Sequence, residues 1–310
     1  MIRTLLWSIW AVLPVLGLSY HFGPGQTHLS RDYAASLLAE ARRAEAEAER
    51  LHQAAFDAHL AVFESQRRAF VDTSIAAEDI PDAAREAVQA ERDAYERASD
   101  AWASAAALYG EVASLLRVDG VPATGELGRR GAVTDDFDAI SLAEARAMVR
   151  SGEVFRGISR LESILEERMA SGDSDERGSI LTASVREELA ASKYVGARLL
   201  REEGFPGEVW REVATEARQH YALLAQREFQ VGQSPEAERL RLNVERVLDL
   251  EQSDRSELDG MPLPRRSPRG RRAGDRDPGD GPPENQPSQQ PRRGPPANGA
   301  SGRMPFGPGW

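Results

Sequence analysis

Cysteine is absent from the 310 residues of this chain, which excludes disulfide bonds, thiolate nucleophiles and cysteine-ligated metals. Lysine is almost absent too, since Lys193 is the only lysine among 39 basic residues. Aromatic residues make up 6% of the chain, and much of its 41% apolar content is alanine. Alanine favours helix but buries little surface, so the composition predicts long, thin helical packing.

Sequence motifs of catalysis are also missing. The chain has no phosphate-binding glycine loop, no nucleophile elbow and no strand–helix alternation typical of a nucleotide fold. His52 and His59 are seven residues apart, whereas two metal ligands on one helix need an i,i+4 spacing. Asp135, Asp136 and Asp138 lack the glycine and the distal glutamate of a calcium loop. We therefore expect a protein without enzymatic activity, cofactor or bound metal.

The charge of the chain is uneven. Its formal net charge is −11, yet residues 259–310 hold nine arginines and five acids and are therefore basic. The remainder is strongly acidic, which argues against nucleic acid as a partner of the folded part.

Residues 4–22 contain no charged side chain and are rich in leucine, isoleucine, valine and tryptophan. Nineteen helical residues rise about 28 Å, close to the thickness of a bilayer core. Because Arg3 precedes this run, the positive-inside rule predicts that the bulk of the chain lies outside the cytoplasm. We interpret residues 1–26 as the signal anchor of a single-pass protein in a bacterial cell membrane. The alternative is a cleaved signal peptide, with Gly17 and Ser19 at the −3 and −1 positions, which leaves a secreted or periplasmic protein.

Residues 27–118 carry two apolar seams with alternating spacings of three and four, the heptad period of a left-handed coiled coil. The first seam is Leu37, Ala41, Ala44, Ala48, Leu51, Ala55, Ala58 and Val62; the second is Ala84, Ala87, Glu91, Ala94, Ala98, Ala101, Ala105, Leu108, Val112 and Leu115. A short connector around Pro81 separates them, so we predict a long antiparallel coiled-coil hairpin.

Larger side chains form a stripe beside the second seam, at seven-residue steps along the second helix of the hairpin: Val88, Tyr95, Trp102 and Tyr109. Two interpretations remain open. In the first, the stripe widens the core within the chain. In the second, it is a protein-binding surface for a third helix or for another subunit, such as a second copy of the chain in a homo-oligomer.

Residues 119–140 are rich in Gly, Pro, Thr and Asp and read as a linker. Ser141 and Glu144 then form a capping-box pattern that opens a helical domain over residues 141–258. Within it we predict helices at 142–150, 154–170, 180–203, 206–231 and 235–250. Gly152, Gly172 and Gly204 are the expected C-terminal stops.

The start of this domain resembles a tetratricopeptide repeat. The matching small, large and turn positions are Ala145, Met148, Gly152, Gly157, Leu161 and Ile164, and a weaker match runs through Ala197, Leu200, Gly204, Val209 and Val213. The family's Trp-Leu-Gly and terminal proline positions are absent, so the resemblance supports stacked helical hairpins better than a regular array. It implies a concave protein-binding face, for which the candidate polar contacts are Arg146, Arg150, Arg186, Lys193 and Arg201.

Residues 259–310 contain 12 of the 18 prolines and 10 of the 26 glycines, so we expect a disordered tail. Its basic cluster runs from Arg265 to Arg272 and suits an anionic surface. The order of membrane segment, coiled coil, linker and tetratricopeptide-like domain is similar to that of some bacterial envelope proteins. The resemblance implies a membrane-anchored scaffold or adaptor that mediates protein–protein interactions. Alternatives are a structural spacer of the envelope and a non-catalytic accessory subunit of an envelope complex.

Overall fold

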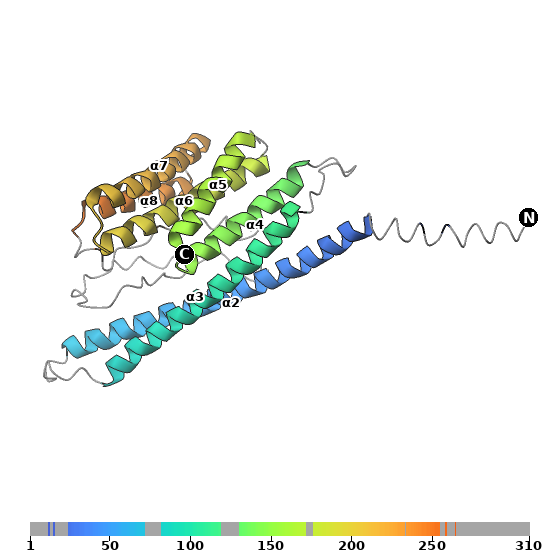
Figure 1. Cartoon of the computed structure of the whole chain (residues 1–310). Coiled ribbons are helices and arrows are strands. Elements are labelled where there is room, and N and C mark those ends of the chain that lie inside the picture. Colours follow the sequence, from blue (N-terminus) through green and yellow to red (C-terminus); the bar gives the residue numbers. More distant parts are fainter. Residues whose placement is uncertain are drawn as a thin grey trace, which may run out of the picture.

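The computed structural model describes residues 24–71, 82–118, 130–171, 176–232 and 234–254, together with four isolated positions, Val12, Val15, Leu258 and Pro264. Over these residues the protein is all-α, as predicted, with seven helices and no strand (Figure 1). The helices are α2 (Pro24–Val71), α3 (Asp82–Val118), α4 (Arg130–Arg150), α5 (Val154–Ser171), α6 (Glu176–Glu202), α7 (Gly207–Val231) and α8 (Pro235–Gln252).

Helices α2 and α3 form the predicted long hairpin, and they pack along one another in antiparallel directions (Figure 1). The first seam faces the partner helix, since Ala41, Ala48, Ala55 and Val62 are buried at seven-residue steps. On α3 the equivalent buried residues include Ala98 and Ala105. Small side chains at these positions let the two backbones approach closely, at the cost of little buried apolar area per residue.

Two helix starts differ from the sequence-based expectation. Helix α2 begins at Pro24, inside residues 1–26, which we predicted as the anchor segment. Proline is compatible with this start because a first helical position loses no intrahelical hydrogen bond. Helix α4 begins at Arg130, within the predicted linker of residues 119–140. The turn-forming composition of that stretch was misleading because tertiary contacts stabilise its second half. Ile140 is buried in a cluster with Leu37 and Tyr109.

Helix α4 joins the hairpin to the remaining helices, since it packs against α3 on one side and against α5 and α6 on the other. A buried ion pair between Asp138 of α4 and Arg168 of α5 adds to this joint. At Gly157 of α5 the two helices approach so closely that an added Cβ would lie 2.4 Å from Val149 Cγ2. The glycine therefore permits the α4–α5 packing.

The predicted stops at Gly152 and Gly204 are confirmed, since both residues have positive φ, of 97° and 86°. Each forms the paired hydrogen bonds of a Schellman motif. The amides of Gly152 and Glu153 donate to Val149 and Met148 at 3.2 and 3.0 Å. The third predicted stop, Gly172, lies outside the described residues.

Helix α6 lies at the centre of the helical domain, between α5 and α7 and against α4. Its buried side chains Leu189, Tyr194 and Val195 meet those of α5, α7 and α8 in one apolar core. Leu258 is part of this core, and Arg198 of α6 donates a hydrogen bond of 2.8 Å to its carbonyl oxygen. The predicted domain end at residue 258 therefore coincides with a buried side chain.

No helix in the described part of the chain is long and apolar enough to cross a membrane. The predicted anchor at residues 4–22 lies outside the described residues, apart from Val12 and Val15. The tail predicted at residues 259–310 also lies outside them, apart from Pro264.

Candidate protein-binding surface

The side chain of Lys193 links three helices. It extends from α6 and binds the carboxylates of Glu162 on α5 and Glu216 on α7. Burial opposes its charge, but the two carboxylates outweigh burial and raise the pKa of Lys193 above its ordinary value. Lys193 therefore stays charged at neutral pH and acts as a structural joint, with its ammonium group already occupied.

Arg186 lies two turns before Lys193 on α6, on the same face. Its guanidinium is 3.4 Å from Nδ1 of His220 on α7 and 3.6 Å from the sulfur of Met169 on α5. No carboxylate in the described part of the chain forms an ion pair with it. Burial, and then the positive charge of Arg227, lower the pKa of Arg186. This half-buried cation therefore lacks the counter-charge that such a group favours.

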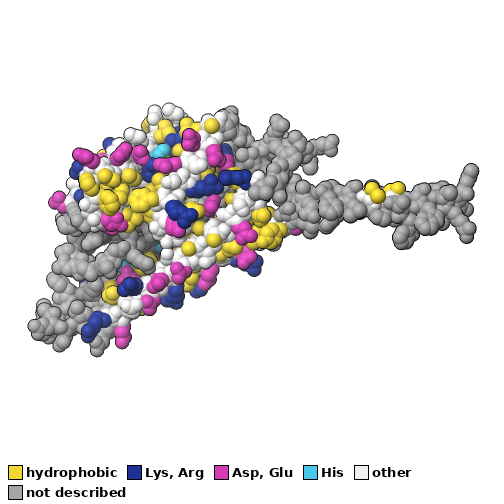
Figure 2. All heavy atoms as spheres, viewed as in Figure 1, with side chains coloured by type: hydrophobic (Ala, Val, Ile, Leu, Met, Phe, Trp, Pro, Cys, Tyr) yellow, Lys and Arg dark blue, Asp and Glu magenta, His cyan; other side chains and the backbone are white. Residues whose placement is uncertain are grey.

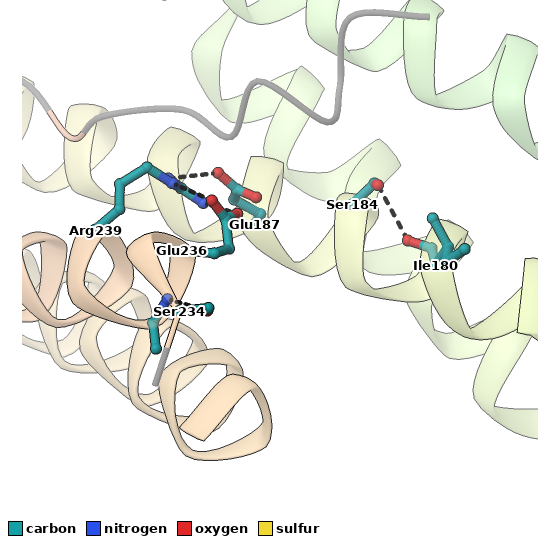
Figure 3. A network of polar contacts seen from close by, with 7 residues as sticks. Ile180, Ser184, Glu187, Ser234, Glu236 and Arg239 are labelled. Atoms are coloured by element: carbon teal, nitrogen blue, oxygen red, sulfur yellow. Dashed lines mark hydrogen bonds and ion pairs between the residues drawn. The ribbon is translucent and has the colours of Figure 1, made fainter. Parts of the chain in front are cut away.

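The two acids that follow Arg186 in the sequence point to other helices. Glu187 accepts a 2.8 Å ion pair from Arg239 of α8, which also binds Glu236 at the start of that helix (Figure 3). Glu188 is buried and binds Arg146 of α4 at 3.0 Å. The three successive side chains of residues 186–188 thus face three directions. The one that faces α5 and α7, Arg186, has no acidic partner among the residues that the structure describes.

His220 adds a neutral imidazole to this surface. Burial, and then the charges of Arg186 and Lys193, lower its pKa to about 4. The imidazole is therefore uncharged at neutral pH and can donate or accept a hydrogen bond without adding to the positive charge.

Besides His220, this side of the helical domain carries two arginines, Arg186 and Arg227, and two exposed apolar side chains, Met169 and Leu223. Leu223 and Arg227 follow His220 on the same face of α7 at i+3 and i+7. Leu223 and Met169 are both largely exposed. Arg227 donates to Ser179 of α6 and, within the described residues, has no carboxylate partner. Arginine and methionine are enriched at protein interfaces, where apolar contact surrounds a charged anchor.

We call this set the α5–α7 surface: Met169, Arg186, His220, Leu223 and Arg227. The face of the molecule seen in Figure 2 mixes acidic, basic and hydrophobic side chains over the helical domain. The α5–α7 surface differs from such a mixture because neither of its two arginines forms an ion pair with an acid in the described part of the chain.

Three other predicted contact residues are engaged within the chain. Arg146 binds Glu188, and Glu188 together with Glu45 of α2 outweighs burial to raise the pKa of Arg146. Arg150 binds Glu49 of α2 at 2.6 Å and lies over the ring of Trp102 at 4.5 Å.

Arg201 lies over the ring of Trp210 at 4.6 Å and donates to the carbonyls of Leu250 and Ser253. It therefore fixes the end of α8. Of the five predicted basic contacts, Arg186 is the one whose charge the described residues do not balance.

The aromatic stripe is mostly internal. Trp102 and Tyr109 are buried beneath α4, while Tyr95 is buried with its ring edge toward His52. Val88 is exposed. The third helix that one interpretation of the stripe required is thus α4 of the same chain, and only the Val88 end remains open to another molecule.

The sequence interpretation missed Arg227, Met169 and Leu223 as members of the α5–α7 surface. The i, i+3, i+7 spacing of His220, Leu223 and Arg227 was a signal that could have revealed their common face. Nothing in the spacing of α5 could have shown that Met169 meets them, because that contact depends on how α5 packs on α6. Among the described residues no group of three or more histidine, aspartate or glutamate side chains is arranged to hold a metal.

The fold and this surface define an all-α protein in which a helical hairpin carries a compact helical domain with an unbalanced basic and apolar face. No protein-family model matches the chain, and neither a curated protein nor a solved structure is similar to it. Its function is therefore argued from its own residues.

Proposed function

We propose that this chain is a membrane-anchored scaffold on the extracytoplasmic side, which binds another protein through the α5–α7 surface and has no catalytic activity. The apolar run at residues 4–22 supports an anchor. The coiled-coil hairpin then serves as an arm, since the 48 residues of α2 rise about 72 Å. The α4–α5 and α6–α7 pairs are compatible with a tetratricopeptide-like arrangement, a fold that commonly binds proteins.

The observation that carries the proposal is the absence of a described carboxylate beside Arg186 and Arg227. In a chain of net charge −11, most of the other arginines that the structure describes in the helical domain form ion pairs with acids. A partner that supplies a carboxylate relieves the repulsion between the two guanidinium groups and forms charge-assisted hydrogen bonds. Apolar side chains beside that carboxylate would pack on Met169 and Leu223. The chemistry of the partner is therefore an acidic segment flanked by apolar residues.

Site-specific photocrosslinking tests this interaction. A photoreactive amino acid replaces Leu223 in the full chain, which is expressed in the cells that naturally produce it, and the crosslinked protein is identified by mass spectrometry. We expect one dominant adduct, and Arg186→Gln should reduce it roughly tenfold, as for loss of an interface anchor.

Arg241→Gln is the matched control for that experiment. Arg241 is exposed on α8 and pairs only with Glu238 and Glu245 of its own helix, among the contacts described. The control removes the same charge and should leave the adduct unchanged. Equal loss in both variants, or no loss with Arg186→Gln, would show that the α5–α7 surface is not the binding site.

The length of the hairpin favours a second candidate, a structural spacer of the cell envelope. Deletion of residues 141–250 distinguishes the two. If the set of proteins bound to the chain is unchanged by the deletion, the helical domain is not an adaptor and the spacer is favoured. A non-catalytic accessory subunit predicts instead that the deletion lowers the activity of an associated envelope enzyme.

Membrane anchoring has its own measurement, N-terminal sequencing of the mature protein combined with membrane fractionation. An intact N-terminus in the membrane fraction supports the anchor. A start after Ser19 supports a cleaved signal peptide, and an intact chain in the cytosol would refute both.

A further inference from the structure

Sulfur in this chain is confined to five methionines, because cysteine is absent. The structure describes two of them, Met148 and Met169. Met148 is partly buried against the cluster that contains Trp102. Met169, on the last turn of α5, is 65% exposed. Among the described residues, the thioether of Met169 is therefore the sulfur that an oxidant in solution reaches most readily.

The sulfur of Met169 contacts the cation that lacks an acidic partner in the described part of the chain. Nη2 of Arg186 donates to Sδ of Met169 at 3.6 Å, while Nη1 lies 3.4 Å from Nδ1 of His220. Neither contact supplies negative charge, and a thioether is a weak acceptor. A stronger acceptor attached to the sulfur would therefore meet an N–H group that already points toward it.

We propose that Met169 is an oxidation site that regulates the α5–α7 surface, because its sulfoxide accepts a hydrogen bond from Arg186 and displaces the bound acidic segment. The displacement rests on the proposed function. The hydrogen bond between the sulfoxide and Arg186 does not, since both groups belong to this chain.

The oxidant is a peroxide. The terminal oxygen of hydrogen peroxide bonds to a lone pair of Met169 Sδ, the O–O bond breaks, and the proton of the transferred oxygen passes to the leaving hydroxide to give water. The sulfur is thereby oxidised and the peroxide reduced, with no further co-reactant. Methionine sulfoxide reductases reverse the step with a dithiol, which becomes a disulfide while the sulfoxide oxygen leaves as water.

Oxidation changes the α5–α7 surface in two ways. The exposed apolar side chain of Met169 becomes polar, so it no longer packs well against an apolar residue of the partner. The sulfoxide oxygen also occupies the N–H group of Arg186 that the partner's carboxylate would use. The flexible methionine side chain can rotate to bring this oxygen to Nη2. Because the sulfoxide has no net charge and Arg227 is unaffected, we expect binding to weaken and not to vanish.

The first measurement needs no partner. The full chain is treated with hydrogen peroxide, and peptide mapping by mass spectrometry follows the oxidation of each methionine. We expect Met169 to be oxidised roughly tenfold faster than Met148, because it is more exposed. Equal rates at the two residues would overturn the proposal.

The hydrogen bond is tested by comparing urea midpoints before and after oxidation. Arg186→Leu removes the donor, and oxidation of the other methionines contributes equally to the natural chain and to this variant. Oxidation should therefore lower the midpoint less, or raise it more, in the natural chain than in Arg186→Leu. Equal changes would show that the sulfoxide does not bind Arg186.

Regulation is tested with the photocrosslink at Leu223. Peroxide treatment should reduce the adduct about fivefold or more, as for loss of an interface contact, and both sulfoxide reductases with a dithiol should restore it. In Met169→Leu the adduct should keep its starting level, whatever that level is. In Met148→Leu, which keeps Met169, the adduct should still fall.

Two results of the crosslinking overturn the proposal: an equal loss of the adduct in Met169→Leu, or no loss in the natural chain. If the untreated natural chain forms no adduct at all, the proposed function fails instead. The urea midpoints then still decide whether Arg186 binds the sulfoxide, so the two failures are distinguishable.

Discussion

The hairpin and the helical domain bury very different side chains. The interface of α2 with α3 is lined by alanine at Ala41, Ala48, Ala55, Ala98 and Ala105. The core around α6 holds leucine, valine, isoleucine and tyrosine, with buried ion pairs at its edges. An alanine interface buries little apolar area, so its stability depends on the close approach of the two backbones. The helical domain instead gains stability by burying large apolar side chains. The hairpin is therefore stabilised from outside, by Trp102 and Tyr109 packed beneath α4.

The largest expected effect of a substitution on the free energy of unfolding is in the helical domain, at the buried ion pair of Arg168 and Asp138. Their side chains are 3% and 9% exposed. Arg168→Met leaves the Asp138 carboxylate buried without its cation, and we expect a loss of about 3–5 kcal/mol in the free energy of unfolding. Urea denaturation followed by circular dichroism measures it. The double variant Asp138→Leu with Arg168→Met should recover much of the loss; if it does not, the pair is not the cause.

In the hairpin the expected loss of stability is smaller, and it arises because a larger side chain does not fit between the two helices. Ala48→Leu puts three more carbon atoms where Ala48 is fully buried between α2 and α3, and should cost about 1–3 kcal/mol. Ala46→Leu, at an exposed position on the same helix, is the control and should leave the urea midpoint unchanged. Equal behaviour of the two variants would mean that close backbone approach does not govern this helix pair.

A third prediction compares two cations on one face of α6. Lys193→Met removes the joint between Glu162 and Glu216 and should lower the urea midpoint. Arg186→Met removes a cation that burial and Arg227 already disfavour, so the midpoint should stay the same or rise. A fall with Arg186→Met similar to that with Lys193→Met would show that Arg186 has a structural role.

The smallest expected effect is the pH dependence of folding stability that His220 causes. Its pKa is about 4 in the folded protein and near 6.5 when unfolded. Between these values the unfolded chain binds more protons, so stability should fall as the pH drops from about 6.5 to about 4. The charged groups facing His220 are Arg186 and Lys193 of α6, Glu216 of α7 and Glu162 of α5.

The variant His220→Gln isolates that contribution. It removes the titrating group, so its urea midpoint should decline less steeply over the same pH range than that of the natural chain. Parallel profiles for the two proteins would show that His220 does not titrate between the folded and unfolded states in this way.

Local sequence signals predicted most of the helices. The helices predicted at 154–170, 206–231 and 235–250 match α5, α7 and α8 within two residues at each end, because Gly152, Gly204 and Pro235 act locally. The start of α4, predicted at residue 142, was wrong by 12 residues, or about three helical turns, since the helix begins at Arg130. Residues 130–140 carry turn-forming residues, and their helix is stabilised by contacts of Phe137 and Ile140 with α2 and α3, which composition does not encode.

The candidate site was predicted less well than the fold. The five basic residues were candidates for the concave face that the tetratricopeptide resemblance implies, and four of them bind within the chain. Their partners lie far along the sequence: Glu49 is 101 residues from Arg150, and Glu188 is 42 residues from Arg146. No local pattern distinguishes these paired cations from Arg186.

The sequence by itself determined the helices, the seven-residue seams and the acidic balance, because helix propensity, heptad spacing and glycine stops act over a few residues. Only the tertiary structure decided which charges are balanced and which apolar stripe stays exposed. Both depend on packing between distant segments: α4 covers Trp102 and ends before Val88, and the acids nearest Arg186 turn toward α4 and α8.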